Sequence, residues 1–186
     1  MLKQLFRRHS PEGILDAART LRSELKIARR HRKGLQQARK FASRSGLKVN
    51  FGCGPHMKSG WVNIDLEDSA DVQLDLRREL PLRDASCRIT YSEHFFEHLE
   101  YPGQAMHFLR ECHCILEPGG TFSVGVPDTA LYMFAYAAGT TELFDTAKRI
   151  WHPAWCQTRM EHINYHFPRA QSIALPTMSR RSQPPS

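Results

Sequence analysis

The spacing of apolar residues predicts a long helical segment near the start of the chain. Apolar side chains recur there at steps of three and four, which is the period of an amphipathic helix. Ser10 and Pro11 suit the N-cap and first turn. Gly34 interrupts the pattern, and Gly46 follows a second basic stretch in the position of a C-cap glycine. We therefore predict two helices or one kinked helix with one apolar face that packs on something. That face consists of Ile14, Ala18, Leu21, Leu25 and Ala28.

From Leu47 onward, short runs rich in β-branched and aromatic residues alternate with helical runs. Such alternation is typical of an α/β fold with a mostly parallel sheet. Only about nine residues separate the first two strands, so the helix between them must shrink to about a turn, or these strands are not neighbours. The segment 118–120, Pro-Gly-Gly, should turn a helix into the last strand. Predicted strands cover 47–51, 61–66, 71–75, 88–92 and 120–126, and predicted helices cover 93–99 and 103–116, with two more after Asp128.

Charge is unevenly distributed along the chain. Residues 1–48 carry 14 Lys and Arg against 3 Asp and Glu, whereas residues 49–186 carry 12 against 16. A cationic helical arm suits an anionic membrane surface, nucleic acid or an acidic partner, but a solvated helix packed on the domain fits the same pattern. We predict a basic helical arm at 1–46, a domain at 47–167, and a disordered tail rich in Pro, Ser and Arg at 168–186.

Cysteine usage and hydropathy indicate a cytoplasmic protein. The five cysteines lack the spacing of a disulfide framework, which favours reduced thiols. The N-terminus has no apolar run of the signal-peptide kind, and the longest apolar run, 130–138, is too short to span a bilayer. We expect a soluble protein, or one bound peripherally to the inner membrane surface through residues 1–46.

The most informative segment is 48–55, an apolar strand that runs into a Gly-x-Gly turn at Gly52 and Gly54. Asp65 closes the next strand, where a carboxylate can accept both hydroxyls of a ribose. A dinucleotide-binding fingerprint needs a third glycine and a later acidic residue, but Met57 occupies that glycine position here. A ligand without phosphates is therefore expected, and S-adenosylmethionine fits that description.

Other polar residues close further predicted strands, and ligands of open parallel sheets lie over those strand ends. Asp75 can accept the adenine amino group, while Ser92 or Glu93 can flank the methionine end. The predicted cofactor-binding residues are Phe51, Gly52, Cys53, Gly54, Asp65, Asp75, Leu76, Ser92 and Glu93.

Several short segments follow one another in an order that is more specific than any single motif. They are 50–54, 60–65, 71–72, 75–76, 80–82, 91–94, 97–99, 116–120 and 126–128. Through them the chain resembles, over about residues 47–166, the small class I S-adenosylmethionine-dependent methyltransferases of the type 11 kind. The resemblance implies a Rossmann-like three-layer domain, S-adenosylmethionine as cofactor, and methyl transfer to an unidentified acceptor such as a sugar or another small molecule.

The C-terminal part departs from this family. After a segment like 161–165, family members continue into another helix and a final antiparallel strand pair, whereas this chain enters the Pro-, Ser- and Arg-rich segment. We therefore expect a shortened domain without that pair, and self-association through the uncovered surface. An alternative function is an inactive methyltransferase-like domain that acts as a binding protein. An RNA methyltransferase is a weaker alternative, because the domain is acidic and shows no aromatic-rich platform for RNA.

Methyl transfer needs little side-chain chemistry, because the sulfonium is already a strong electrophile. A hydroxyl acceptor also benefits from a general base, for which His94, His98 and Asp128 are the candidates. His162 fits the same role, and a capping or packing role competes for each residue.

Two histidine patterns invite comparison with metal sites. Residues 94–98 satisfy the H-x-x-E-H pattern of inverted zinc peptidases, but their surroundings match the methyltransferase family instead. Residues 112–114, Cys-His-Cys, lie on a predicted helix where neighbouring side chains point in different directions. We therefore assign no metal ligands.

Overall fold

Five parallel strands in the order β3-β2-β1-β4-β5 form the central sheet, which confirms the predicted α/β fold. The computed structural model describes residues 12–150 and 152–165. Within these residues, every strand pair is parallel and no antiparallel pair follows β5. The elements are α2 (Glu12–Ala38), η1 (Arg39–Phe41), β1 (Leu47–Phe51), β2 (Val62–Asp65), β3 (Val72–Gln73), β4 (Cys87–Glu93), η2 (Phe96–His98), α3 (Gly103–Ile115), β5 (Leu116–Gly125), α4 (Thr129–Ala137), α5 (Glu142–Ile150) and α6 (Arg159–Tyr165).

The chain divides into two units, Met1–Pro127 and Asp128–Ser186, which differ from the predicted parts. The basic helix belongs to the same unit as the sheet, and the helices after Asp128 form a unit of their own. The predicted tail at 168–186 and the predicted cap at Ser10 and Pro11 lie outside the described residues.

The connection between β1 and β2 contains no helix. The two strands pair directly, with Val49 beside Val62, and residues 52–61 join them as a loop of turns. This resolves the expectation from the short spacing: the crossover helix is absent and the strands are neighbours. The loop therefore begins at the carboxyl end of β1 and returns to the amino end of β2, and its first residues lie beside the end of β2, where the Gly52 N–H donates to Ile64 at 2.8 Å.

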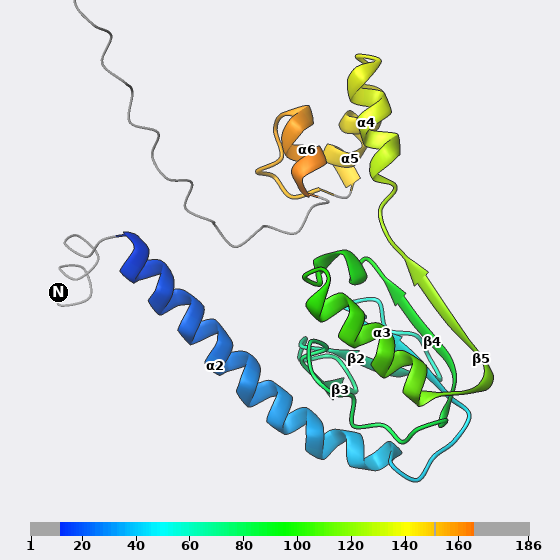
Figure 1. The fold of residues 1–186 in the computed structure, drawn as a ribbon. Coiled ribbons are helices and arrows are strands. Elements are labelled where there is room, and N and C mark those ends of the chain that lie inside the picture. The colour runs from blue at the N-terminus through cyan, green and yellow to red at the C-terminus, as the bar shows by residue number, and fades with distance from the viewer. Residues whose placement is uncertain (1–11, 151, 166–186) are drawn as a thin grey trace, which may run out of the picture. The chain divides into compact units, whose positions relative to one another are not determined.

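The apolar core of the first unit lies between the sheet and α3, which crosses one face of the sheet (Figure 1). Phe108 of α3 is fully buried and meets Phe51 of β1 edge-on, with 5.3 Å between the ring centroids. Phe95 packs against the same ring at 5.5 Å. This aromatic cluster lies directly beneath the end of β1.

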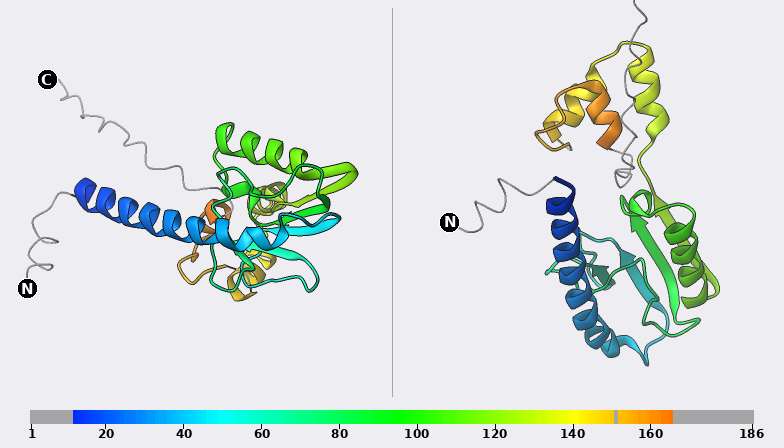
Figure 2. Two further views of the ribbon diagram at one scale, coloured as in Figure 1. Left: turned by 90° about the horizontal axis from the view of Figure 1, so that it is seen from below. Right: turned by 60° about the vertical axis from the view of Figure 1, so that its left-hand side comes forward.

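Helix α2 runs through Gly34 without a break, and its C-terminal half packs along strand β3 (Figures 1 and 2). Gly34 and Ala38 are buried there, with Ile27 and His31 half-buried on the same face. The N-terminal half extends beyond the sheet. The predicted packing face was therefore wrong: Ile14, Leu21 and Leu25 are 54%, 62% and 51% exposed. Helix α2 instead packs on β3 through the face that contains Gly34, because the missing side chain lets the backbones of α2 and β3 approach closely. This face is not the most apolar one.

Two boundaries also differ from the prediction. The helix predicted at 93–99 is only the short turn η2, because His94 has a left-handed φ of 54° that ends any regular helix there. Strand β5 begins at Leu116, directly after α3, so Pro118, Gly119 and Gly120 lie within the strand. Its pairing with β4 shifts register between Cys87 and Ile89.

The second unit is built from α4, α5 and α6, one helix more than predicted. Its core consists of Tyr132, Phe144, Ala147 and Ile163. Thr158 and Glu161 form a capping box at the start of α6: the Thr158 hydroxyl accepts from the Glu161 backbone, and the Glu161 carboxylate accepts from the Thr158 backbone. No helix among the described residues is long and apolar enough to cross a membrane.

Candidate functional site

The loop after β1 contains two glycines in left-handed conformations, with φ of 64° at Gly52 and 47° at Gly54. The two positions differ in their surroundings. A Cβ atom on Gly52 would lie 2.4 Å from the Cβ atom of Phe95, so the protein itself requires glycine there. A Cβ atom on Gly54 would meet no protein atom within 4 Å. Gly54 therefore borders open space, where a ligand can approach the backbone.

A buried polar network fixes this loop to the sheet. The Asn50 side chain donates to the Asn63 side chain at 3.1 Å, and Asn63 donates to the Asp71 carboxylate at 2.9 Å. The Lys58 backbone donates to the Asn63 side chain at 2.8 Å. Sequence analysis did not assign this role to any of these residues, although two asparagines within apolar strands were a visible signal.

Asp65 ends β2 beside the glycine turn, as predicted. One of its carboxylate oxygens accepts the Gly54 backbone N–H at 2.9 Å, and the other accepts the Glu67 N–H at 3.0 Å. Each oxygen retains a second acceptor position, because a carboxylate offers about four lone-pair sites. The backbone thus holds this carboxylate rigidly while leaving it able to accept hydroxyl donors.

A cavity of about 160 Å³ lies over these strand ends. It brings together five residues that sequence analysis had selected separately, namely Gly52, Asp65, Asp75, Leu76 and His98. Its remaining lining residues are Ile27, Leu66, Leu74, Arg77, Phe95 and Leu99, and Ile27 comes from α2.

Asp75 lines this cavity with a carboxylate that is already paired. The Arg77 guanidinium donates to both of its oxygens, at 2.8 and 3.0 Å, and also binds Glu24 of α2 at 3.0 Å. Burial raises the pKa of Asp75, but hydrogen bonds from Arg77 outweigh that effect and leave the pKa below its ordinary value. His31 of α2 accepts the Asp75 backbone N–H at 3.2 Å. Sequence analysis missed Arg77, Glu24 and His31, because the contacts join distant parts of the chain.

The other predicted cofactor-binding residues lie around the cavity without lining it. Phe51 belongs to the core, and burial, with the Asp65 charge second, raises the pKa of Cys53 to about 11. Ser92 is fully buried, and its hydroxyl has no hydrogen-bond partner among the described residues. Glu93 is exposed and accepts the Tyr91 hydroxyl at 2.6 Å.

The three candidate catalytic residues have different locations. His98, in η2, lines the cavity. The His94 side chain is 67% exposed and lies 3.6 Å from Glu97. Asp128 belongs to the second unit and caps α4 by accepting the Leu131 N–H at 3.2 Å. Of the three, the structure brings only His98 to the cavity that contains Gly52 and Asp65.

The zinc-peptidase pattern at 94–98 lacks its structural basis, because an α-helix is needed to bring its two histidines onto one face and η2 is only three residues long. Cys112 is buried, whereas Cys114 is exposed. Neither 94–98 nor 112–114 is among the groups of His, Cys, Asp and Glu side chains that lie close enough together to hold a metal in the described part of the chain.

A second, wider cavity of about 530 Å³ lies between α2, the loop after β3 and α3. Arg77 forms part of the wall of both cavities. The wider one is lined by His31, Leu35, Arg77, Arg78, Glu79, Leu80, Pro81 and His107. It contains neither the glycine turn nor Asp65, so the smaller cavity is the better candidate for a nucleoside site despite its size.

A family model described as a methyltransferase domain matches residues 30–124, slightly more than half of the chain. A solved structure from Methanococcus maripaludis, named as a candidate S-adenosyl-L-methionine-dependent methyltransferase, is similar over 76% of this chain and 77% of that chain, with 16% identity and a TM-score of 0.36. No curated protein matches the chain.

Proposed function

The chain belongs to the methyltransferase domain family, and on that premise we propose that it binds S-adenosylmethionine at the cavity beside Gly52 and Asp65 and methylates a small-molecule acceptor. The observation that carries the proposal is the rigid Asp65 carboxylate next to Gly54, whose open side has no protein atom within 4 Å of a Cβ position. Together they offer a hydroxyl acceptor and a close backbone approach, which a ribose needs.

The cavity fits a part of the cofactor. Pockets that enclose a whole drug-sized ligand usually measure about 300 Å³ or more, whereas this one measures about 160 Å³. The apolar side chains of Leu66, Leu76 and Leu99 in its wall suit the flat face of a purine. The Asp65 carboxylate would accept the ribose hydroxyls, and the space beside Gly54 would take the part that the cavity does not enclose.

When bound, S-adenosylmethionine supplies an electrophilic methyl group. The residues of this chain then have three tasks. Asp65 orients the cofactor, the apolar wall of the cavity excludes water, and His98 takes a proton from the acceptor. A neutral His98 imidazole in the cavity wall can accept the proton that a hydroxyl or amine acceptor loses on methylation. His94 is exposed outside this wall, so His98 is the stronger candidate for the base.

For the acceptor we propose a small molecule, with sugars as the first class to test. Residues 49–186 carry 12 Lys and Arg against 16 Asp and Glu, which disfavours a nucleic-acid substrate held by the domain itself. The family resemblance supplies the sugar class.

Calorimetry with S-adenosylmethionine tests the site. Asp65→Asn keeps the shape but removes the charge, and we expect it to weaken binding by about 10- to 150-fold, because hydrogen bonds to charged groups contribute roughly 1.5–3 kcal/mol. Asp84→Asn removes an exposed carboxylate outside the cavity lining and should leave binding unchanged. Equal affinity for the parent and Asp65→Asn would show that the site is misassigned.

A second assay tests the base. His98→Gln should lower the rate of S-adenosylhomocysteine formation by roughly 10²- to 10⁴-fold, far more than it lowers the affinity for S-adenosylmethionine through the change in the cavity wall. A panel of sugars, other small molecules and RNA, assayed with the parent, identifies the acceptor class. Turnover with RNA alone would contradict the small-molecule proposal.

A further inference from the structure

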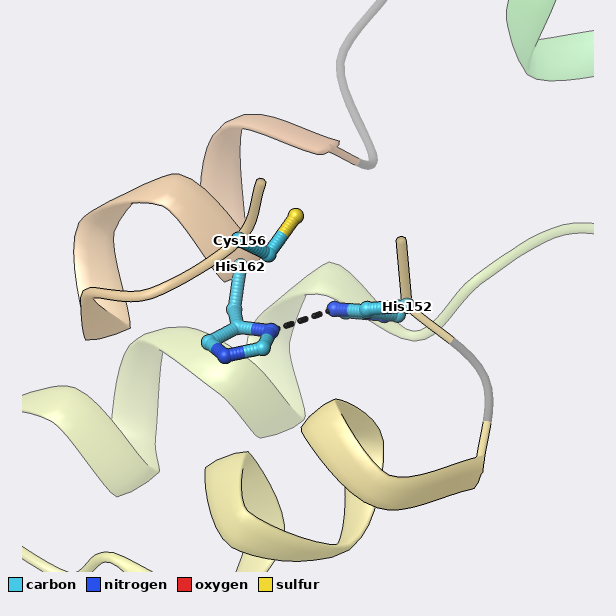
Figure 3. Close-up of side chains that lie close together, drawn as sticks. All are labelled: His152, Cys156 and His162. Atoms are coloured by element: carbon cyan, nitrogen blue, oxygen red, sulfur yellow. Dashed lines mark hydrogen bonds between the residues drawn. The ribbon is translucent and has the colours of Figure 1, made fainter. Parts of the chain in front are cut away.

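Three side chains with metal-binding atoms lie close together in the second unit (Figure 3). None of them has a role in the proposed reaction. His152 follows α5, Cys156 lies in the connecting loop, and His162 lies on α6. The Nδ1 atoms of the two histidines are 2.6 Å apart, and the ligand atoms of all three residues lie within 4.8 Å of one another. Sequence analysis assigned no metal ligands to these residues, because their H-x₃-C-x₅-H spacing matches no common zinc motif.

The cluster is buried and its backbone is well fixed. Cys156 is fully buried, and His162 and His152 are only 2% and 9% exposed. The His152 N–H donates to Ala147 of α5 at 2.8 Å, and the Cys156 N–H donates to Pro153 at 3.0 Å. The capping box at the start of α6 places His162 one turn into that helix. Three local structures therefore hold the three side chains around one point.

The surroundings also orient His152 for coordination through Nδ1. Its other ring nitrogen, Nε2, lies 3.5 Å from the Tyr132 hydroxyl, and the two rings stack with 5.8 Å between their centroids. Histidines that bind metals usually donate their second N–H to an oxygen, which fixes the tautomer and the ring orientation. Tyr132 offers such an oxygen.

A neutral hydrogen bond between the two imidazoles is the competing explanation, with one Nδ1–H donating to the other Nδ1. It accounts for the 2.6 Å distance and leaves the buried Cys156 thiol with one long contact, a donation to the Glu161 carbonyl at 3.8 Å. In a tetrahedral zinc site with Zn–N bonds of 2.0–2.1 Å, the two nitrogens are roughly 3.3 Å apart. The rings would need to separate by only about 0.7 Å, which small side-chain rotations allow.

We propose that His152, Cys156 and His162 bind a zinc ion that stabilises the second unit. Two imidazoles and one thiolate are the donors zinc prefers, whereas magnesium and calcium require oxygen ligands. Among the described residues the cluster supplies three ligands, and water would take the fourth position. In the described part of the second unit the apolar cluster has four buried residues, and a core this small gains stability from a metal that links α5, the connecting loop and α6.

The test uses the full-length protein, reduced and freed of metal with a chelator. It is titrated with Co²⁺ alone as a spectroscopic probe and then with Zn²⁺ alone as a competitor. We expect about one Co²⁺ per chain, a thiolate-to-cobalt charge-transfer absorption, and loss of that absorption on addition of Zn²⁺. Zn²⁺ should also raise the melting temperature of the parent protein. A parent protein that shows no thiolate absorption, or that melts identically with Zn²⁺ and with chelator, overturns the proposal.

Variants identify the ligands. Cys156→Ser should lose the thiolate absorption and bind Zn²⁺ roughly 100-fold more weakly, whereas Tyr132→Phe should keep the absorption and bind roughly 10-fold more weakly. Cys114→Ser, which changes an exposed cysteine, is the matched control and should behave as the parent does. Absorption that survives in Cys156→Ser, or disappears in Cys114→Ser, assigns the thiolate elsewhere and overturns the site. If Cys156→Ser does not fold, the Cys114→Ser result and the parent melting data still decide the question.

Discussion

Replacement of Gly34 by alanine tests how α2 is attached to the sheet. Alanine normally stabilises a helix relative to glycine, by about 1 kcal/mol. Here the added Cβ atom would lie 1.9 Å from the backbone oxygen of Gln73 and 2.6 Å from its carbonyl carbon. Backbone atoms cannot rotate away, so α2 must move by roughly 1.5 Å to restore ordinary van der Waals contact.

The movement also strains the contacts that α2 makes with the sheet. The Gln37 side chain accepts the Gln73 N–H at 2.9 Å, and His31 accepts the Asp75 N–H at 3.2 Å. Overpacking costs about 1–3 kcal/mol, and each lost hydrogen bond costs about 1 kcal/mol, which together exceed the gain in helix propensity. We expect a net loss of about 2 kcal/mol, equivalent to about 1 M in the midpoint of urea unfolding.

Urea unfolding followed by circular dichroism measures this loss, and the same helix provides the control. A Cβ atom on Gly13 would meet nothing within 4 Å, so Gly13→Ala should be neutral or stabilising by up to about 1 kcal/mol. Gly34→Ala should also bind S-adenosylmethionine more weakly, because Ile27 of α2 lines the cavity. If Gly34→Ala raises the urea midpoint as Gly13→Ala does, α2 does not pack on β3 as described.

Three further predictions concern the cofactor site, the buried ion pair and the basic arm. Gly54→Ala should fold with a loss of about 1 kcal/mol from its positive φ, yet bind S-adenosylmethionine much more weakly in calorimetry, because its Cβ enters the open space assigned to the ligand; undiminished affinity would remove Gly54 from the site. Arg77→Gln should destabilise the protein by about 1–3 kcal/mol, discounted for the partial exposure of Arg77. Because the folded pKa of Asp75 is lowered, its contribution in the parent is present above about pH 4 and lost as the pH falls through that lowered pKa. In Arg77→Gln burial is no longer offset by the guanidinium, so this acid-induced loss should shrink or reverse, and identical profiles of urea midpoint against pH would refute the pairing. For the arm, we propose binding to an anionic membrane, because α2 carries seven Lys and Arg against three Asp and Glu and also exposes Leu21 and Leu25. Sedimentation with anionic vesicles should decline with salt and in the double variant Arg22→Glu, Arg29→Glu, and salt-independent or absent binding would leave the arm a structural helix.

The sequence predicted the parts of the fold that depend on local pattern. Strand β1 has the predicted bounds, and α3 ends one residue before its predicted end. The Gly-x-Gly turn and Asp65 could be placed together because parallel strands end at the same edge. The helix at 93–99 was wrong because the left-handed backbone at His94 cannot be derived from its side chain.

Long-range contacts could not be predicted in the same way. The hydrophobic period of α2 pointed to Ile14 and Leu21, yet the packed face is centred on Gly34, where the absence of a side chain permits contact with Gln73. Glu24 and Arg77 lie 53 positions apart and pair only because α2 runs beside β3. The His152–Cys156–His162 cluster needs the turn between α5 and α6, for which the sequence carries no standard spacing.

Arg77 binds both Glu24 of α2 and Asp75 of the cavity wall. A change at one of these carboxylates therefore affects the contact that Arg77 makes with the other. A ligand group that replaces Arg77 at the Asp75 carboxylate would change the contact between the guanidinium and Glu24. Thermodynamic linkage is reciprocal: the factor by which a ligand in the cavity alters binding at α2 equals the factor by which a surface bound to α2 alters ligand affinity. On the two proposals above, membrane binding by α2 and S-adenosylmethionine binding in the cavity are therefore linked through Arg77.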